Sequence, residues 1–335
     1  MQRLTIATLL VGTVLGASSA LAEEVNVYSS RHYDTDDAFF AAFTEKTGIT
    51  VNRIEDDADV LIERIRSEGD LGAADVFITV DVGRLARADD AAIFQPLDVD
   101  VVKEVVPANL HTKDWTAFSR RARIIFYDKA DVTDPPQTYD DLADPKYKGL
   151  ICTRSSSNVY MQSLLASIIV NEGEEKARAW AEGVKNNLAR DPEGGDTDQL
   201  RGLVSGECDI ALSNHYYFAR GLSGEVAGLT EGVDGIGIVW PNQETNGTHI
   251  NISGIGVAKY APHPEAARKL IEFTLTPEAQ GLLASDNNEF PVLEGVPASE
   301  AVASMGEFTP DTVDIGKVAA ASSAAQKIYN EVGYK

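Results

Sequence analysis

The sequence lacks the short motifs that mark common hydrolases. It has no Gly-x-Ser-x-Gly elbow, no His-Glu-x-x-His pair and no Cys-x-x-Cys pair. The near matches GLSGE and GIGVAK break the motifs that they approach. We therefore predict that the protein is not an enzyme, and a secreted hydrolase stays open as the alternative from another functional class.

Positive charge is also scarce. Lysine and arginine number 29 against 52 aspartates and glutamates. Without Arg3, which belongs to the amino-terminal segment described next, 28 basic residues face 52 acidic ones and the net charge is −24. Phosphate binding needs a basic face, so we expect no nucleic-acid partner. An acidic surface commonly accompanies solubility, and it would also raise the local concentration of cations.

Long hydrophobic runs are missing beyond the first 22 residues. The start MQRLTIATLLVGTVLGASSALA places Arg3 before an apolar stretch that is too short to span a bilayer, and it ends in the small-residue pattern Ala20-Leu21-Ala22. This pattern predicts a signal peptide over residues 1–22, with cleavage near Ala22 and export of the rest. We expect no membrane span in the mature chain.

Cysteine is nearly absent, with only Cys152 and Cys208 in the chain. An oxidising compartment would allow one disulfide between them. The alternative is a pair of buried apolar thiols, and the sequence leaves both possibilities open.

A repeated strand and helix pattern fills the remainder of the chain, whose 335 residues suggest two compact units. The runs EVNVYSS, ITVNRIE and ADVFITV are rich in β-branched residues, and each is followed by apolar residues at helical spacing. The first of these helices is expected to stop at Gly48. We therefore predict a β-α-β-α-β unit with parallel strands. RARIIFYD, LICTR and CDIALS predict further strands, the last two again leading into helices.

Four tyrosines lie at three of the predicted strand-to-helix junctions. In an open parallel sheet, ligands bind beyond the carboxyl ends of the strands, where loops lead into helices. Tyr33 lies in the first such loop, Tyr160 follows SSSN, and Tyr216 and Tyr217 follow DIALSN. Each helix start also carries a residue that could cap it, namely Thr35, Asn158 and Asn214.

The adjacent pair distinguishes two local structures. On a strand, Tyr216 and Tyr217 would point to opposite faces, whereas in a first helical turn they diverge by about 100° and long side chains can still converge. A shared ligand therefore predicts a helix start, where the helix dipole favours negative charge. The alternative is simple aromatic packing, with each hydroxyl bonded to water.

Several phenols together favour a hard cation of high charge. A phenol has a pKa near 10, so ionising several at neutral pH requires a cation that displaces the protons. Calcium and magnesium prefer carboxylates and carbonyls, and zinc sites more often use Cys and His. Ferric iron is the biologically common trivalent ion, so we predict Fe(III), with Fe(II) as a second state that the site could hold.

Four segments carry a resemblance to a known family: VNVYSSRHYDTD, CTRSSSNVYMQSLLAS, GECDIALSNHYYFAR and HINISGIGVAKYAPHPEAARKLIEFTLTPEAQ. From the mature amino terminus to the carboxyl end, the chain resembles the ferric iron-binding proteins of periplasmic ABC importers, and more closely their FutA branch. The resemblance implies an α/β, two-lobed periplasmic binding protein fold (type II), in which each lobe has a parallel-rich sheet with flanking helices and the ligand cleft lies between the lobes.

The resemblance also implies a division of the chain. The first lobe would hold residues 23–122 and 246–296, and the second would hold residues 123–245 and 297–335. The crossover hinge would lie near 121–126 and 241–248. Such a fold closes on its ligand by a hinge motion.

Individual roles follow from the same resemblance. Tyr33 would be the iron ligand of the first lobe, and Tyr160, Tyr216 and Tyr217 those of the second. His32 corresponds to a histidine that ligates iron in some members and points away in others.

The resemblance also implies that three arginines act around the iron. Arg123 would hold a synergistic anion such as carbonate or bond a tyrosinate, the alternative being a salt bridge in the hinge strand. Arg220 would compensate phenolate charge or lie on a helix surface, and Arg154 is a further candidate.

The implied function is capture and delivery without turnover. A monomeric periplasmic protein would bind iron between its lobes and pass it to an ABC transporter permease in the inner membrane. The principal alternative is a protein of the same fold that binds an organic or oxyanion solute, such as a polyamine, thiamine or a phosphate-like ligand.

Overall fold

A computed structural model of the protein describes residues 23–31, 33, 35–224 and 226–335. The strands are β1 (Glu24–Ser29), β2 (Thr50–Glu55), β3 (Val76–Val80), β4 (Thr116–Asp128), β5 (Ile151–Cys152), β6 (Ile210–Asn214), β7 (Ile236–Val239), β8 (Ile250–Val257) and β9 (Phe290–Pro291). The α-helices are α1 (Asp36–Thr47), α2 (Ala58–Glu68), α3 (Val82–Asp90), α4 (Asp100–Val105), α5 (Val159–Glu172), α6 (Glu174–Asn186), α7 (Asp196–Ser205), α8 (His215–Leu222), α9 (Pro264–Thr274), α10 (Pro277–Asn287), α11 (Glu300–Ala303) and α12 (Ile315–Val332). Within these ranges, no helix combines the length and the apolar character that crossing a membrane requires.

The first lobe is built on the predicted β-α-β-α-β unit. β1, β2 and β3 are parallel, in the order β2-β1-β3, with α1 and α2 as their connections. α1 ends at Gly48, whose φ of 74° is left-handed and whose N–H bonds the carbonyl of Thr44. The predicted stop is therefore confirmed. β8 extends the sheet as an antiparallel neighbour of β3.

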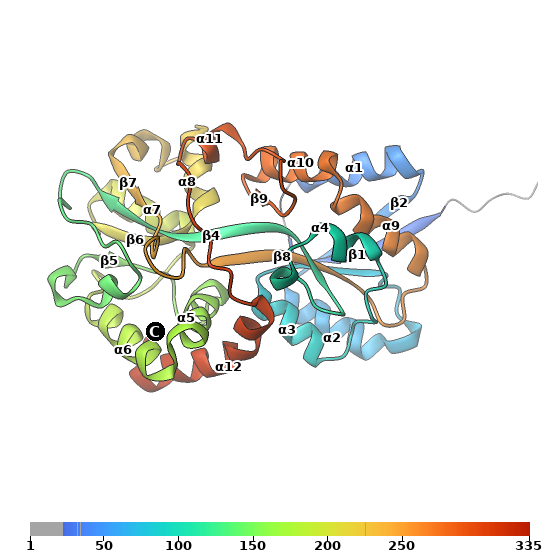
Figure 1. Ribbon diagram of the computed structural model, residues 1–335, viewed down its shortest axis with the longest axis horizontal. Coiled ribbons are helices and arrows are strands. Elements are labelled where there is room, and N and C mark those ends of the chain that lie inside the picture. Colours follow the sequence, from blue (N-terminus) through green and yellow to red (C-terminus); the bar gives the residue numbers. More distant parts are fainter. Residues whose placement is uncertain (1–22, 32, 34, 225) are drawn as a thin grey trace, which may run out of the picture.

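One long strand joins the two lobes. β4 pairs with β8 and β9 along its first half and with β6 and β7 along its second half. Figure 1 shows β4 and β8 running together across the middle of the molecule. The sequence predicted a strand only over residues 121–128, whereas β4 begins at Thr116. The added residues pair with β8, a partner distant in sequence that the local pattern does not reveal. The proposed division of the chain into lobes stays a prediction.

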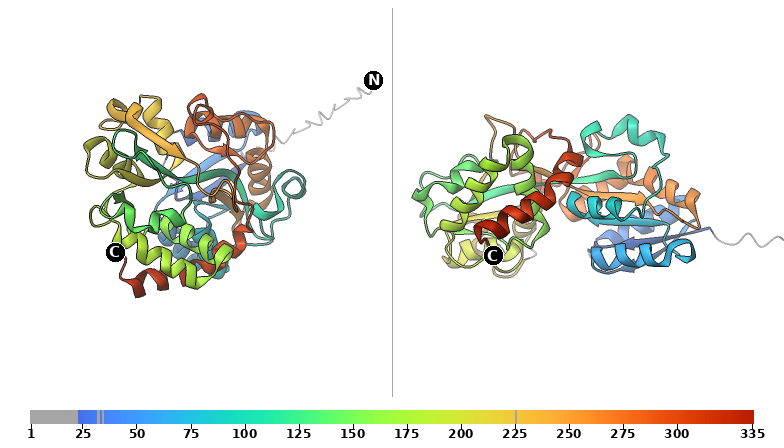
Figure 2. Two further views of the ribbon diagram at one scale, coloured as in Figure 1. Left: turned by 60° about the vertical axis from the view of Figure 1, so that its left-hand side comes forward. Right: turned by 90° about the horizontal axis from the view of Figure 1, so that it is seen from below.

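The second lobe repeats the strand-to-helix pattern. β6 is antiparallel to β4, and β5 lies beside β6 in parallel register. α5 follows β5 and α8 follows β6, as the sequence predicted. The predicted two-lobed α/β architecture is thus confirmed, and the right-hand view in Figure 2 shows the two bodies side by side. The second-lobe sheet is mixed, because β6 and β7 are antiparallel to β4 and only β5 and β6 are parallel.

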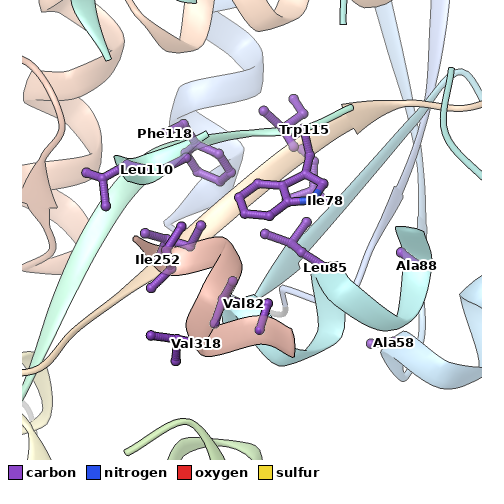
Figure 3. Close-up of a cluster of buried hydrophobic side chains, with 14 of the residues drawn as sticks. Ala58, Ile78, Val82, Leu85, Ala88, Leu110, Trp115, Phe118, Ile252 and Val318 are labelled. Atoms are coloured by element: carbon purple, nitrogen blue, oxygen red, sulfur yellow. The ribbon is translucent and has the colours of Figure 1, made fainter. Parts of the chain in front are cut away.

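Helix α12 packs against both lobes. It contacts α5 and α6 of the second lobe and α3 of the first, and the right-hand view of Figure 2 shows it in red, running along one body toward the other. In Figure 3, Val318 of α12 lies near Val82 of α3, below a group of apolar side chains that includes Leu85, Ile252 and Phe118. All are buried. Burying one such side chain contributes about 1.5–3 kcal/mol, so this core holds the surrounding loops in place.

Candidate functional site

Three of the four tyrosines occupy the first turn of a helix. Tyr160 is the second residue of α5, and Tyr216 and Tyr217 are the second and third residues of α8. The helix start predicted for the adjacent pair is therefore confirmed. Their ring centroids lie 4.3 Å apart, so the two side chains converge despite their different directions on the helix. Tyr33 lies in the loop before α1, where its carbonyl accepts the backbone N–H of Asp36.

The phenols of the second lobe come together around their hydroxyl groups. The hydroxyl oxygens of Tyr160 and Tyr216 are 3.5 Å apart, although 56 residues separate them in the chain. Both side chains are buried, whereas Tyr33 and Tyr217 are half-buried. Among the described residues, no cluster of three or more His, Cys, Asp or Glu side chains could hold a metal ion. The tyrosines are the candidate metal site because their phenol groups converge.

Arginines surround the four phenols. The guanidinium carbon of Arg220 lies 5.2 Å from the ring centroid of Tyr33, 5.7 Å from that of Tyr216 and 6.0 Å from that of Tyr217. This one side chain thus links the first-lobe tyrosine to the pair on α8. Arg31 is 4.8 Å from the ring of Tyr33. These contacts place positive charge beside the rings, where it would stabilise phenolates.

Three further arginines complete the surroundings. Arg121 lies 5.5 Å from the ring of Tyr216, and Arg123 and Arg154 lie 5.9 and 5.6 Å from that of Tyr160. Arg31 and Arg121 were missed at the sequence level. For Arg121 a signal existed, because residues i and i+2 of a strand share a face and Arg123 was already a candidate.

A buried ion-pair network supports the first-lobe side. Glu289 pairs with Arg31 at 3.2 Å and with Arg121 at 2.6 Å, and Asp36 pairs with Arg31 at 2.9 Å. Ser253 accepts bonds from both arginines. The pKa of Glu289 is lowered, because Arg31 and Arg121 outweigh the cost of burial, which would raise it. The carboxylate therefore stays charged, as a buried bridge between two cations requires.

Arg123 takes part in a second buried ion pair. Its Nη1 lies 3.1 Å from a carboxylate oxygen of Asp196 and donates to Asn214 at 3.1 Å. Both members of the pair are almost fully buried. The geometry thus contains the salt bridge that the sequence left open for Arg123, while the guanidinium still lies beside the ring of Tyr160.

The environment keeps three phenols protonated in the absence of a metal. Burial raises the pKa of Tyr216 and Tyr217 well above the usual value near 10, and the neighbouring phenols add to the rise. Burial and Tyr160 likewise raise the pKa of Tyr33, against the opposing effect of Arg121. Only a strongly polarising cation could replace these protons near neutral pH.

The predicted helix caps have mixed outcomes. Asn158 accepts the backbone N–H of Tyr160 at 3.0 Å, so this cap is confirmed. The prediction is wrong for Asn214, whose side-chain oxygen accepts from Arg123 instead. It is also wrong for Thr35, whose hydroxyl bonds Asn287. In both cases a long-range partner competes successfully for the short polar side chain.

The remaining candidates from the sequence are His32 and the two cysteines. His32 lies outside the described residues. Cys152 and Cys208 form a disulfide between the end of β5 and the turn before β6, so of the two alternatives for these cysteines the structure contains the disulfide.

Comparisons with known proteins agree with this fold. The family model for bacterial extracellular solute-binding proteins matches residues 29–281. Iron uptake protein A1 of Synechocystis is 49% identical over 93% of this chain and 88% of its own length. A Trichodesmium FutA structure in complex with iron and citrate has a TM-score of 0.89 at 46% identity, covering 93% of this chain and 100% of its own.

A further solved relative is in an open conformation. The ferric iron-binding protein A of Mannheimia haemolytica, in an open conformation, has a TM-score of 0.87 at 39% identity, covering 93% of this chain and 99% of its own. The chain therefore belongs to the bacterial extracellular solute-binding proteins, in the branch of the iron uptake and ferric iron-binding proteins.

Proposed function

We propose that this protein captures Fe(III) through the phenolate oxygens of Tyr33, Tyr160, Tyr216 and Tyr217 and delivers it to an ABC transporter permease. The convergence of phenols from both lobes inside a group of arginines carries the proposal. Similar proteins that bear iron or ferric iron in their names support it. The mechanism is binding and release, without turnover.

Charge favours the ferric ion over the ferrous ion. Four phenolates carry four negative charges, and a trivalent cation neutralises more of them than Fe(II) does. Arg220 lies near three of the rings and offsets the remaining charge. Carbonate is the proposed synergistic anion, held beside the tyrosines by arginine side chains that are not fully used in ion pairs, such as Arg121, whose Nε and Nη1 have no partner among the described residues.

The place of action follows from the amino-terminal segment and the relatives. We propose that residues 1–22 are removed near Ala22 and that the mature monomer works in the periplasm. There the closed, iron-loaded lobes would meet the permease in the inner membrane. Hinge closure around the ligand is the motion that this architecture allows.

The test is a spectroscopic titration of the mature protein. Fe(III) and Fe(II) are added separately, with and without bicarbonate or citrate, and the visible spectrum is recorded. We expect a purple-red phenolate-to-iron band with Fe(III), strengthened by the anion. A protein that binds a polyamine or thiamine, and neither form of iron, would contradict the proposal.

A further inference from the structure

Asp81, at the end of β3, is a buried carboxylate that receives hydrogen bonds from three directions. The hydroxyl of Ser163 on α5 donates to Oδ1 at 2.6 Å, and the amide of Asn251 on β8 donates to Oδ2 at 2.7 Å. The backbone N–H of Gly83 donates to Oδ1 at 2.8 Å. Asp81 and Ser163 are both fully buried. Such charge-assisted bonds are stronger than bonds between neutral groups.

The backbone of Asp81 is in a conformation that is rare for a residue other than glycine. Its φ is 78° and its ψ is 131°, and its N–H bonds the carbonyl of Ile252 at 2.8 Å. Strained residues of this kind persist only where the surroundings hold them firmly, and they gather at functional sites. Here the bonds from Ser163, Asn251 and Gly83 to the carboxylate hold this conformation.

The contact between Asp81 and Ser163 joins the two lobes beside the tyrosine site. β3 belongs to the sheet of the first lobe, and α5 follows β5 in the second. Ser163 lies one helical turn after Tyr160. Val80, the neighbour of Asp81, forms a small buried cluster with Val159 and Tyr160. The start of α5 is thus fastened to the first lobe by one ionic hydrogen bond and one apolar contact.

We propose that the hydrogen bond from Ser163 to Asp81 is a latch that holds the lobes together and slows the release of iron. This inference rests on the proposed function. A relative is known in an open conformation, and a contact across the lobes can favour only the state in which it forms. Ser163 acts on Tyr160 through helix α5, which carries both residues. It is therefore a positioning residue and not a metal ligand.

The direct test compares two serine variants on the same helix. Ser163→Ala removes the latch, and Ser167→Ala is the control, because Ser167 is also buried but bonds Asp311 instead. Iron release to an excess of a strong chelator is followed at the visible band. We expect release about tenfold faster for Ser163→Ala, as the loss of a bond to a charged acceptor implies. The band itself should stay at the same wavelength, and Ser167→Ala should match the wild type.

Two more measurements separate the latch from the proposed function. Small-angle scattering of the iron-depleted proteins should give a larger radius of gyration for Ser163→Ala than for Ser167→Ala. Ser163→Ala should accelerate iron release less in the Asp81→Asn variant than in the wild type, because Asp81→Asn has already weakened the same hydrogen bond. If the wild type binds no iron, the proposed function fails and scattering alone decides on the latch. Equal release rates and equal radii for the two serine variants would overturn the latch.

Discussion

The two lobes bring their phenols to the site in different ways. In the second lobe, Tyr160, Tyr216 and Tyr217 are fixed in the first turns of helices, and two of their hydroxyls are already 3.5 Å apart. In the first lobe, Tyr33 lies in a loop, and the guanidinium groups of Arg31 and Arg220 both lie near its ring. On the proposed assignment, the second lobe would be a preassembled platform for a cation, and the first lobe would add a single ligand and much of the buried charge.

The buried ion pairs also differ between the lobes, and among the described residues the first lobe has more of them. The first-lobe network joins two arginines through Glu289, with Asp36 as a second carboxylate. In the second lobe, Arg123 has the single carboxylate partner Asp196. The first lobe, which carries only Tyr33 of the four phenols, thus contains the larger ionic network. Arg31 belongs to this network and lies beside the ring of Tyr33.

The largest expected effect comes from removing the platform. Tyr216→Phe together with Tyr217→Phe should abolish most of the visible band and weaken Fe(III) binding by more than about 100-fold, since changing a group that merely supports a metal ligand already costs about 10- to 100-fold. Tyr33→Phe should leave a weaker band and a smaller loss. Titration in competition with citrate measures both. Equal losses for the two variants would contradict the division of roles between the lobes.

The ionic frameworks should differ in their effect on folding. Glu289→Gln leaves two buried arginines without their shared anion, and we expect the free energy of unfolding to fall by about 3–5 kcal/mol. Asp196→Asn removes the partner of one arginine, and its amide oxygen can still accept from Arg123, so the fall should be smaller. Urea denaturation of the iron-depleted proteins provides the comparison. A larger loss for Asp196→Asn would show that the second-lobe pair carries more of the stability.

Arg220 connects the lobes, whereas Arg154 contacts a single ring of the second lobe. Because Arg220 lies near three tyrosines and Arg154 near Tyr160 alone, Arg220→Gln should weaken iron binding by about 10- to 100-fold and Arg154→Gln by less. Affinities measured at low and at high salt would check the electrostatic origin. An effect of Arg220→Gln on folding but none on affinity would exclude charge compensation.

The sequence contained most of the fold because its signals were local. The β-α-β-α-β start, the stop at Gly48 and the helix start at Tyr216 depend on residues within a few positions of one another. The early part of β4 was missed because its pairing partner β8 lies far along the chain. The local residue pattern does not predict a strand end that is stabilised by pairing with a segment distant in sequence.

The same distinction applies to the site. The four tyrosines could be selected because each lies at a strand-to-helix junction, but the network around Glu289 could not. Glu289 and Arg121 are 168 residues apart, and neither the run DNNEF nor the strand residues around Arg121 indicate that they meet. The caps expected at Thr35 and Asn214 failed for the same reason, since partners from other segments bind those side chains.

The pH dependence of iron binding should show how many phenols release a proton. The raised pKa values of Tyr33, Tyr216 and Tyr217 mean that these groups are protonated between pH 6 and 8, so each one that ligates iron must release a proton. The affinity should therefore rise about tenfold per pH unit for each such phenol, and Tyr33→Phe should reduce the slope by one proton. Affinities against a chelator at several pH values, together with protons released into a weak buffer, measure the slope. Because Tyr33 is the single first-lobe phenol, an unchanged slope in Tyr33→Phe would mean that the platform of the second lobe binds the ion without it.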